Sequence, residues 1–274
     1  MRVRVSPSAP FVPLLLLLAS LAPSAVAWDG DGHAAIGVLA VEQASPVTRQ
    51  ALSRLLAENT PGATVGADTI AAACRYPDAY RETAGGEWSA PLHYVNIDPG
   101  SNRYSAARDC PGGQCVVAAV AKYAGQLGDP SLEPADRARA FGFLCHFMGD
   151  LHQPLHVGYA DDRGGNLVSV RYRGEKLNLH AFWDHALPEH FSDGWRGLAD
   201  TLEARPNTGA RAWNTAELIA WTNETFSVTR NFAYPPSRDI NDAFAQRSWQ
   251  VTLQQMDMAA ERLTLVLNSE LGND

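Results

Sequence analysis

The sequence lacks any hydrophobic run long enough to cross a membrane. Its longest apolar stretch, residues 11–21, is about half of the roughly 20 residues that a membrane-spanning helix needs. Two arginines precede this stretch and the small residues Ala25-Val26-Ala27 follow it, an order typical of a cleavable signal peptide. We therefore expect residues 1–27 to be a signal peptide, a mature chain that begins at Trp28, secretion or export to the periplasm, and no stable membrane association.

Basic residues are also scarce. The chain has 22 Lys and Arg against 30 Asp and Glu, which gives a formal charge of −8. Removal of residues 1–27 would take away two arginines and no acid and would leave −10. Proteins that bind nucleic acid usually carry a basic patch. If this chain acts on nucleic acid, we expect a bound divalent metal to supply the positive potential locally.

No linker rich in Pro, Gly or Ser, no internal repeat and no low-complexity segment divides residues 28–274, so we predict one domain. The only strand-like alternation, in residues 166–172, allows a short hairpin at most. Ser45-Pro46 fits a helix start and Pro154 a helix end. Apolar residues recur at helical spacing in residues 33–44, 46–58, 67–83, 114–127, 134–153, 177–191, 213–230 and 239–268. The predicted fold is an all-α, single-domain multi-helix bundle. The sequence does not determine the oligomeric state, and we expect a monomer.

Cysteine occurs only four times, and in an exported protein such residues usually form disulfides. Cys110 and Cys115 enclose Pro-Gly-Gly-Gln, a flexible turn that can bring the two sulfurs together, so we predict a disulfide between them. Cys74 and Cys145 lie in apolar helical patterns. A second disulfide and two buried free thiols are both open for this pair.

Histidine and aspartate, by contrast, are spaced for metal binding. His146 and Asp150 are four residues apart, so on a helix they project from one face and can share a metal ion. His156 follows just after the proline that ends this helix, where the chain can turn a third ligand back. A second segment repeats the spacing with His180 and Asp184.

A single helical His beside an Asp is more often a surface or core pair than a metal site. Here both pairs stand among apolar residues such as Phe143, Phe147 and Trp183, and burying so many ionisable groups without a cation would be costly. Imidazole and carboxylate ligands together suit zinc, and a zinc site with positions open to water suits hydrolysis. The sequence therefore predicts a hydrolytic zinc site.

The other histidines carry less information. Taken singly, His33 and His93 are weak candidates for ligands, as is Asp78. The remaining three are assigned to capping, surface or supporting positions: His152, His185 and His190.

With these motifs the chain resembles the S1/P1 nuclease family, zinc-dependent nucleases that prefer single strands and share their fold with zinc phospholipase C. The resemblance covers essentially all of residues 28–274. The motifs that carry it, in chain order, are Trp28 with His33, Asp78 with Arg81, Leu92-His93-Tyr94, the loop from Asp109-Cys110 to Cys115, His146 to His156, Gly164-Gly165-Asn166, and Asn178 to Asp184.

The resemblance implies three zinc ions per chain. The first would be held by Asp78, His93, His146 and Asp150. The second would be held by His156, His180 and Asp184. The third would be held by the amino group and carbonyl of Trp28, by His33 and by a shared Asp150.

The resemblance also implies an activity: hydrolysis of phosphodiester bonds in single-stranded DNA and RNA to 5′-phosphate products, with 3′-nucleotides as further substrates. A zinc-bridging hydroxide would attack phosphorus in line. Asp78 and Asp150 would take part as zinc ligands, and Arg81 would bind the charge that develops on the phosphate.

Three further positions are implied to contact substrate. Asn166 would contact the scissile phosphate or a group near it, and Tyr94 would form an aromatic wall for the neighbouring base, unless it belongs to ordinary core packing. Asn96 stands where the fungal members are expected to carry an Asp in the base pocket. That change exchanges an acceptor for a group that also donates, so base preference stays open.

Two alternatives remain beside this interpretation. Zinc phospholipase C resembles the chain in fold and in most ligands, but a Glu is expected there in place of Asp184, and residues 77–81 and 110–115 resemble the nucleases. The other alternative is a secreted protein that zinc merely stabilises. Arg81 argues against it, because a structural zinc site needs no phosphate clamp.

Overall fold

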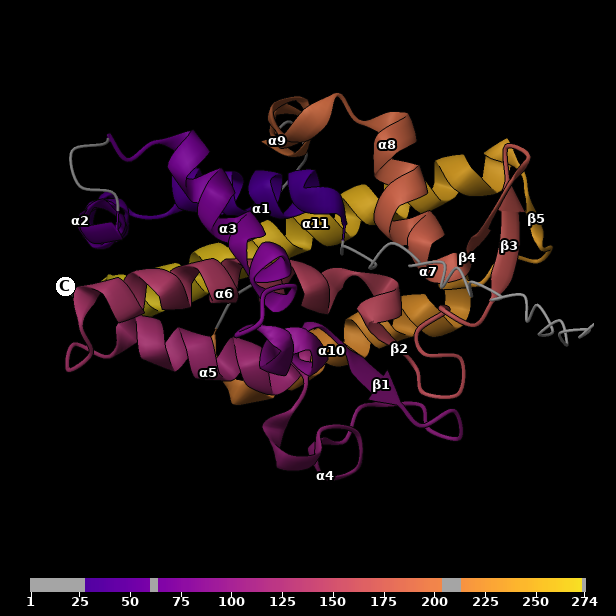
Figure 1. Cartoon of the computed structure of the whole chain (residues 1–274), viewed down its shortest axis with the longest axis horizontal. Helices are drawn as coiled ribbons and strands as arrows, with labels where there is room; N and C mark the ends of the chain where they lie inside the picture. The colour runs from indigo at the N-terminus through magenta and orange to yellow at the C-terminus, as the bar shows by residue number, and fades with distance from the viewer. Residues whose placement is uncertain (1–27, 60–63, 204–212, 273–274) are drawn as a thin grey trace, which may run out of the picture.

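The structure is a computed structural model that describes residues 28–59, 64–203 and 213–272. The expected signal peptide, residues 1–27, lies outside the described residues. Helices account for most of this part of the chain (Figure 1). The α-helices are α1 (Asp29–Gln43), α2 (Pro46–Asn59), α3 (Ala67–Arg81), α4 (Ala106–Asp109), α5 (Val116–Gly128), α6 (Pro134–His152), α7 (Leu179–Ala181), α8 (Leu187–Phe191), α9 (Gly194–Glu203), α10 (Thr215–Val228) and α11 (Asp242–Leu271).

Shorter segments connect these helices. The 3₁₀ turns are η1 (Glu87–His93), η2 (Pro111–Gly113) and η3 (Pro154–His156), and the π-type turns are η4 (Phe182–Ala186) and η5 (Thr229–Ala233). The strands are β1 (Val95–Ile97), β2 (Val157–Tyr159), β3 (Ser169–Tyr172), β4 (Glu175–Asn178) and β5 (Asp239–Ile240). The all-α prediction is confirmed, since the sheets are small.

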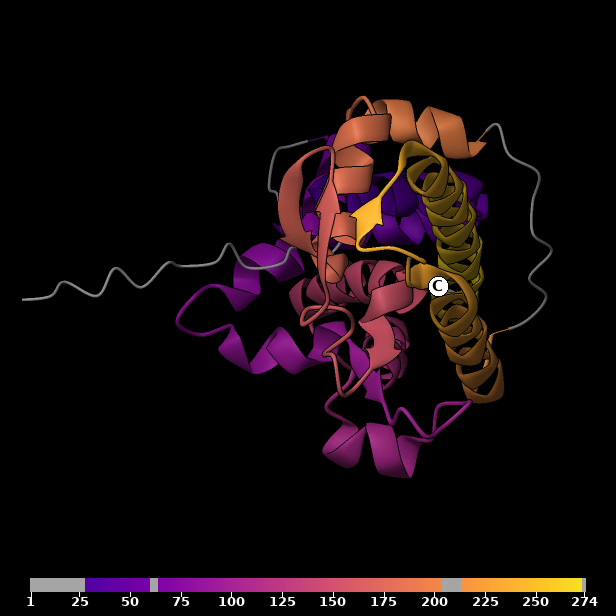
Figure 2. The same cartoon turned by 90° about the vertical axis from the view of Figure 1, so that its right-hand side faces the viewer.

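Helix α6 lies at the centre of the core. It contacts α1, α2, α3, α5 and α11, and every side chain from Ala140 to His152 is buried. The second half of α6 is mainly apolar, as expected of a helix segment in such a central position. The long helix α11 runs past it along the length of the molecule (Figures 1 and 2). The His146 and Asp150 pair is therefore held in the middle of the domain.

Local signals fix the ends of these helices as the sequence predicts. Ser45 precedes Pro46, and its hydroxyl accepts a hydrogen bond from the Thr48 amide at 3.1 Å. Helix α6 ends at His152 because Gln153 is extended and Pro154 cannot continue the helix.

Two of the predicted helices are wrong in part. Residues 177–178, placed in a helix by the spacing of apolar residues, belong to strand β4, which pairs antiparallel with β3 through a turn at Arg173 and Gly174. The predicted hairpin is therefore real, but its first strand begins at Ser169. Residues 239–240 form strand β5 in front of α11. In both places a strand of two to four residues is too short for its period to compete with that of the adjoining helix.

A two-stranded parallel pair, β1 with β2, was not predicted. Val95 pairs with Val157 and Ile97 with Tyr159. His93 lies two residues before β1 and His156 directly precedes β2, so this pairing brings two predicted ligands from distant parts of the chain close together.

Both cysteine pairs form disulfides. The predicted bridge between Cys110 and Cys115 is confirmed. Cys74 and Cys145, for which free thiols were equally open, are also bonded, so a covalent link joins α3 to α6. Among the described helices, none is long and apolar enough to span a membrane.

Candidate metal centre

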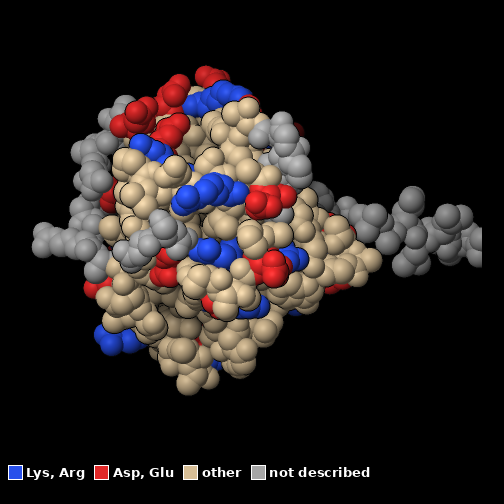
Figure 3. All heavy atoms as spheres, turned by 90° about the vertical axis from the view of Figure 1, so that its left-hand side faces the viewer, with Lys and Arg blue, Asp and Glu red and all other residues tan. Residues whose placement is uncertain are grey.

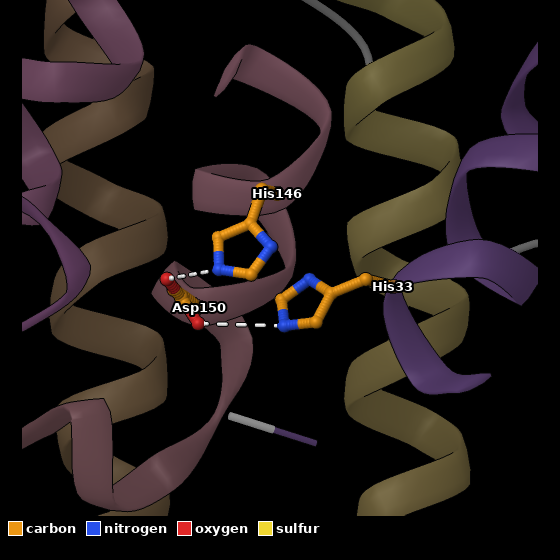
Figure 4. Close-up of side chains that lie close together, drawn as sticks. All are labelled: His33, His146 and Asp150. Atoms are coloured by element: carbon orange, nitrogen blue, oxygen red, sulfur yellow. Dashed lines mark ion pairs between the residues drawn. The ribbon is translucent and has the colours of Figure 1, made fainter. Parts of the chain in front are cut away.

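Asp150 lies at the middle of a buried cluster of imidazoles. Its carboxylate is 3.6 Å from His33 Nε2, 3.0 Å from His93 Nδ1, 3.3 Å from His146 Nε2 and 3.2 Å from His156 Nδ1. Figure 4 shows His33 reaching from α1 toward Asp150 and His146 on α6. Four ring systems from four different elements therefore meet at one carboxylate.

A second acid, Asp78, extends this cluster from α3. Its Oδ1 atom lies 3.4 Å from His146 Nε2 and 3.6 Å from His93 Nδ1. Asp78, His93 and His146 are all buried and could hold one metal ion with one ligand atom each. His33, His146 and Asp150 form an overlapping group of the same kind.

The third group consists of His156, His180 and Asp184, which are also buried. The Asp184 carboxylate lies 3.0 Å from His180 Nε2 and 3.7 Å from His156 Nε2. Gln153 Nε2 also donates a hydrogen bond to Asp184 and so fixes the carboxylate. The predicted His-x-x-x-Asp spacing thus does bring each pair together, although His180 and Asp184 span the junction of α7 and the π-type turn η4.

Backbone carbonyls orient three of the imidazoles. The Nδ1 atom of His146 lies 3.0 Å from the Cys74 carbonyl, and that of His180 lies 2.8 Å from the Gly164 carbonyl. His156 Nδ1 lies 2.6 Å from the carbonyl of His93. A carbonyl can only accept, so each Nδ1 carries the proton and each Nε2 turns toward the centre, the usual support for a metal-binding histidine.

The donor atoms of the cluster fit a metal ion. Buried polar atoms nearly always have a hydrogen-bond partner, yet several atoms here have none among the described residues: both ring nitrogens of His33, both carboxylate oxygens of Asp78, His93 Nε2, Asp150 Oδ1, His156 Nε2 and Asp184 Oδ2. All of these are nitrogen or oxygen atoms of the kind that bind zinc. Bound cations would give partners to the carboxylate oxygens and to one nitrogen of each ring.

Burial and neighbouring charge shift the pKa values of the cluster in opposite directions. Burial lowers the pKa of His33 to about 3 and that of His93 to about 4. Burial also acts to lower the pKa of His146 and His156, but the carboxylates beside them prevail and raise both to about 10. Burial acts to raise the pKa of Asp150, but His146 and His156 hold it well below the ordinary value. Without metal, the centre is a set of buried ion pairs.

A polar cavity of about 480 Å³ opens beside these ligands. Arg81, Tyr94, Asn96 and Asn166, the four predicted substrate contacts that are not metal ligands, all line it. Tyr94 is 40% exposed, so it is not part of the core packing. A larger cavity of about 690 Å³ lies between α2, α3 and α6, but its walls are mainly apolar and include none of the predicted ligands.

The sequence interpretation missed one charged residue of the polar cavity, Arg163. It directly precedes the Gly164-Gly165-Asn166 motif, which was the available signal. His152, assigned to a supporting position, lies buried between the Met148 carbonyl at 2.8 Å and Arg262 Nη1 at 2.8 Å. His185 and His190 join none of the metal-binding groups found among the described residues.

Trp28 lies at the start of α1, five residues before His33. Its side chain is fully buried, and its carbonyl accepts a hydrogen bond from the Gly32 amide at 3.1 Å. These positions are compatible with a ligand at the beginning of α1. Whether a free amino group at Trp28 binds metal stays a prediction.

The surface does not replace the missing basic charge on the face seen in Figure 3. Lys and Arg side chains there alternate with Asp and Glu side chains. The cationic side chains of the polar cavity, Arg81 and Arg163, are thus local features of an acidic protein.

Comparison with known proteins gives one consistent result. The model of the S1/P1 Nuclease family matches residues 28–272. The chain is 30% identical to "Endonuclease 3" of Arabidopsis thaliana over 240 residues, which cover 80% of each chain. It is 33% identical to "Nuclease P1" of Penicillium citrinum over 203 residues, 71% of each chain, and 29% identical to "Nuclease S1" of Aspergillus oryzae over 77% of this chain and 73% of the relative.

Proposed function

Because this chain belongs to the S1/P1 nuclease family, and is therefore a nuclease, we propose that it is a zinc-dependent endonuclease of single-stranded DNA and RNA. Its products would be 5′-phosphates, and it would also remove phosphate from 3′-nucleotides. The observation that carries the proposal is the convergence of three buried His and Asp groups beside one polar cavity that holds the predicted substrate contacts.

Nine residues would hold the zinc ions. Asp78, His93, His146 and Asp150 would bind the first, His156, His180 and Asp184 the second, and Trp28, His33 and Asp150 the third. Bound there, zinc would supply an acidified water as the nucleophile and a Lewis acid for the leaving oxygen. The ligand residues would lose their protons to the solvent as the metal binds.

Arg81 would hold the phosphate. Its guanidinium lies 3.3 Å from Asp78 and 3.4 Å from Glu82, so the carboxylates orient it at the wall of the cavity. A planar guanidinium can give two parallel hydrogen bonds to a phosphate and so favours the charge that develops during attack. Its location beside Asp78, a proposed ligand of the first zinc, supports a role at the scissile phosphate rather than at a more distant one.

Tyr94 and Asn166 would position the rest of the nucleotide. The exposed ring of Tyr94 offers a stacking face that is indifferent to base identity. Asn166 is oriented because its Nδ2 donates to the Arg163 carbonyl at 3.0 Å. A base can enter such a cavity only when it is unpaired, and extraction from a duplex costs a few kcal/mol. We therefore expect duplex DNA to be hydrolysed more slowly than single strands.

The test uses protein that begins at Trp28, with single-stranded DNA, RNA, a 3′-mononucleotide and phosphatidylcholine as separate substrates. We expect hydrolysis of the first three, loss of activity with a chelator and recovery when zinc is returned. Mass spectrometry of the oligonucleotide products should find 5′-phosphates. Products with 3′-phosphates, activity that resists the chelator, or hydrolysis of phosphatidylcholine alone would contradict the proposal.

A further inference from the structure

The loop between β2 and β3 forms one wall of the polar cavity and has an unusual backbone. Arg163, Gly164 and Gly165 are three consecutive residues in the left-handed region, with φ of 56°, 59° and 80°. Glycine adopts this region freely, whereas a side chain is strained there. Among the described non-glycine residues, positive φ occurs only at Arg163, Trp28 and Arg173. The loop thus holds an arginine at a position where a third glycine would have less backbone strain.

Hydrogen bonds brace this loop against the metal centre. Asp162 accepts from the Gly165 amide at 2.9 Å and from the Tyr234 hydroxyl at 2.6 Å. The Gly164 carbonyl lies 2.8 Å from Nδ1 of His180, a predicted zinc ligand. A Cβ atom at Gly164 would come within 2.2 Å of the Leu155 carbonyl oxygen, so the loop also packs closely on η3. The backbone of Arg163 is therefore held in place by the contacts of Asp162 before it and of Gly164 and Gly165 after it.

The backbone of Arg163 is engaged, but its side chain is not. The carbonyl accepts from both the amide and Nδ2 of Asn166. The guanidinium is exposed and lines the cavity, and no hydrogen bond or ion pair joins it to another residue in the described part of the chain. Arg81, on the same cavity, lies close to the carboxylates of Asp78 and Glu82. A guanidinium that has no carboxylate partner and extends from a firmly held backbone favours an anion, above all a phosphate.

We propose that Arg163 binds the phosphate adjacent to the scissile one and so makes the enzyme favour oligonucleotides over 3′-mononucleotides. This inference rests on the proposed nuclease function. Arg81 already serves the scissile phosphate beside the Asp78 ligand, which leaves Arg163 for the next phosphate along the strand. A 3′-mononucleotide has no such phosphate, so it gains nothing from this contact.

The test compares Arg163→Gln with Arg173→Gln. Arg173 is a matched control because it is also an exposed arginine with positive φ that precedes a glycine, but it lies in the β3–β4 turn, outside the polar cavity. With zinc-loaded protein, we expect Arg163→Gln to raise KM for a single-stranded oligonucleotide about tenfold. Its kcat, its zinc content and its KM for a 3′-mononucleotide should stay unchanged. Arg173→Gln should alter none of these quantities.

Salt dependence gives a second readout that a structural role would not move. Each phosphate contact with a single strand contributes about 0.7 to the slope of log affinity against log salt concentration. The slope of log(kcat/KM) for the oligonucleotide should therefore be shallower by about 0.7 in Arg163→Gln, and Arg163→Lys should restore it. Arg163→Gly removes the left-handed strain, so it should fold at least as well as the wild type and still show the higher KM.

Several outcomes would overturn the inference. An unchanged KM and salt slope would exclude the contact. An equal loss on the 3′-mononucleotide would assign Arg163 to the scissile phosphate, and loss of zinc would make the loop a support for His180 only. If the wild type hydrolysed no single-stranded DNA, the proposed function itself would fail, and that result is visible before any variant is compared.

Discussion

At the scale of single residues, Asp150 connects the parts of the centre. It is fully buried, and its two oxygens face imidazoles from α1, η1, α6 and η3. In the proposed centre Asp150 would be a ligand of both the first and the third zinc, a role for which a carboxylate offers two equivalent oxygens. The acid is needed for its two equivalent oxygens and its charge together.

Asp150→Asn should therefore abolish hydrolysis, with a fall in kcat of at least about a thousandfold, because the amide keeps the shape but offers one oxygen and no charge. Elemental analysis should find fewer than three zinc ions per chain. Asp136→Asn, on the exposed first turn of the same helix, is the control and should be nearly silent. Near-normal turnover in Asp150→Asn would show that the bridging assignment is wrong.

The histidines of the centre predict how stability depends on pH in protein stripped of metal. His146 and His156, with pKa values of about 10 against the usual 6.5, add stability that is complete below about pH 6.5 and is lost as pH rises toward 10. His33 and His93, with pKa values of about 3 and about 4, stay neutral in the fold. The unfolded chain binds their protons below about pH 6.5, so stability also falls on the acid side.

We thus expect the unfolding midpoint of chelator-treated protein to be highest near pH 6.5. Urea titrations between pH 4 and pH 9 measure it. In zinc-loaded protein the alkaline loss should disappear, because zinc binds deprotonated imidazoles and replaces the two protons of His146 and His156. A metal-free midpoint that rises steadily from pH 5 to pH 9 would be incompatible with these charges.

At the scale of helices, the centre depends on how closely α1 approaches the link between α3 and α6. Gly37 of α1 packs on the Cys74–Cys145 disulfide, and a Cβ atom there would lie 2.2 Å from Cys74 Sγ and 2.6 Å from Cys145 Sγ. His33 is one helical turn before Gly37 and shares its face of α1. The small residue lets His33 reach Asp150.

Gly37→Ala should destabilise the protein by about 1–3 kcal/mol, because the added methyl group must displace α1 or the disulfide. It should also lower zinc content, since His33 moves with α1. Gly125→Ala is the matched control, a helical glycine of α5 with nothing near its added Cβ atom, and should stabilise by about 0.5–1 kcal/mol. Urea unfolding at fixed zinc concentration measures both. Equal effects of the two substitutions would refute the packing account.

The sequence predicted what is local. Helical periodicity gave most of the helices, and the four-residue spacing gave the pairs His146 with Asp150 and His180 with Asp184. Resemblance to a family, rather than spacing, was needed for His33, Asp78 and His93, because each arrives from a separate element through long-range packing.

For the same reason the β1–β2 pair was not predicted and the Cys74–Cys145 bond was left open beside two free thiols, since they join segments 62 and 71 residues apart. Arg163 escaped notice because only the fold turns the loop before Asn166 onto the cavity wall. Contacts of this range leave no periodic trace in a single sequence.

At the scale of the whole molecule, an acidic protein is proposed to bind an acidic polymer. Lys and Arg are outnumbered by Asp and Glu, and the two signs are mixed on the face seen in Figure 3. We expect the attraction to come from the centre itself, where bound zinc would outweigh the buried carboxylates. The number of zinc ions therefore bears on substrate binding as well as on chemistry.

The number of bound zinc ions is expected to depend on which residue is the first of the chain. The nitrogen of Trp28 can bind a metal only as a free amine, because the lone pair of a peptide nitrogen is delocalised into the carbonyl. Protein that starts at Trp28 should therefore hold about three zinc ions by elemental analysis, and protein that starts at Ala27 should hold about two and be much less active. The two chains differ by one alanine, so their folds should unfold alike once metal is removed. Equal zinc content and equal activity in both proteins would exclude Trp28 as a ligand. Activity would then not depend on the removal of residues 1–27.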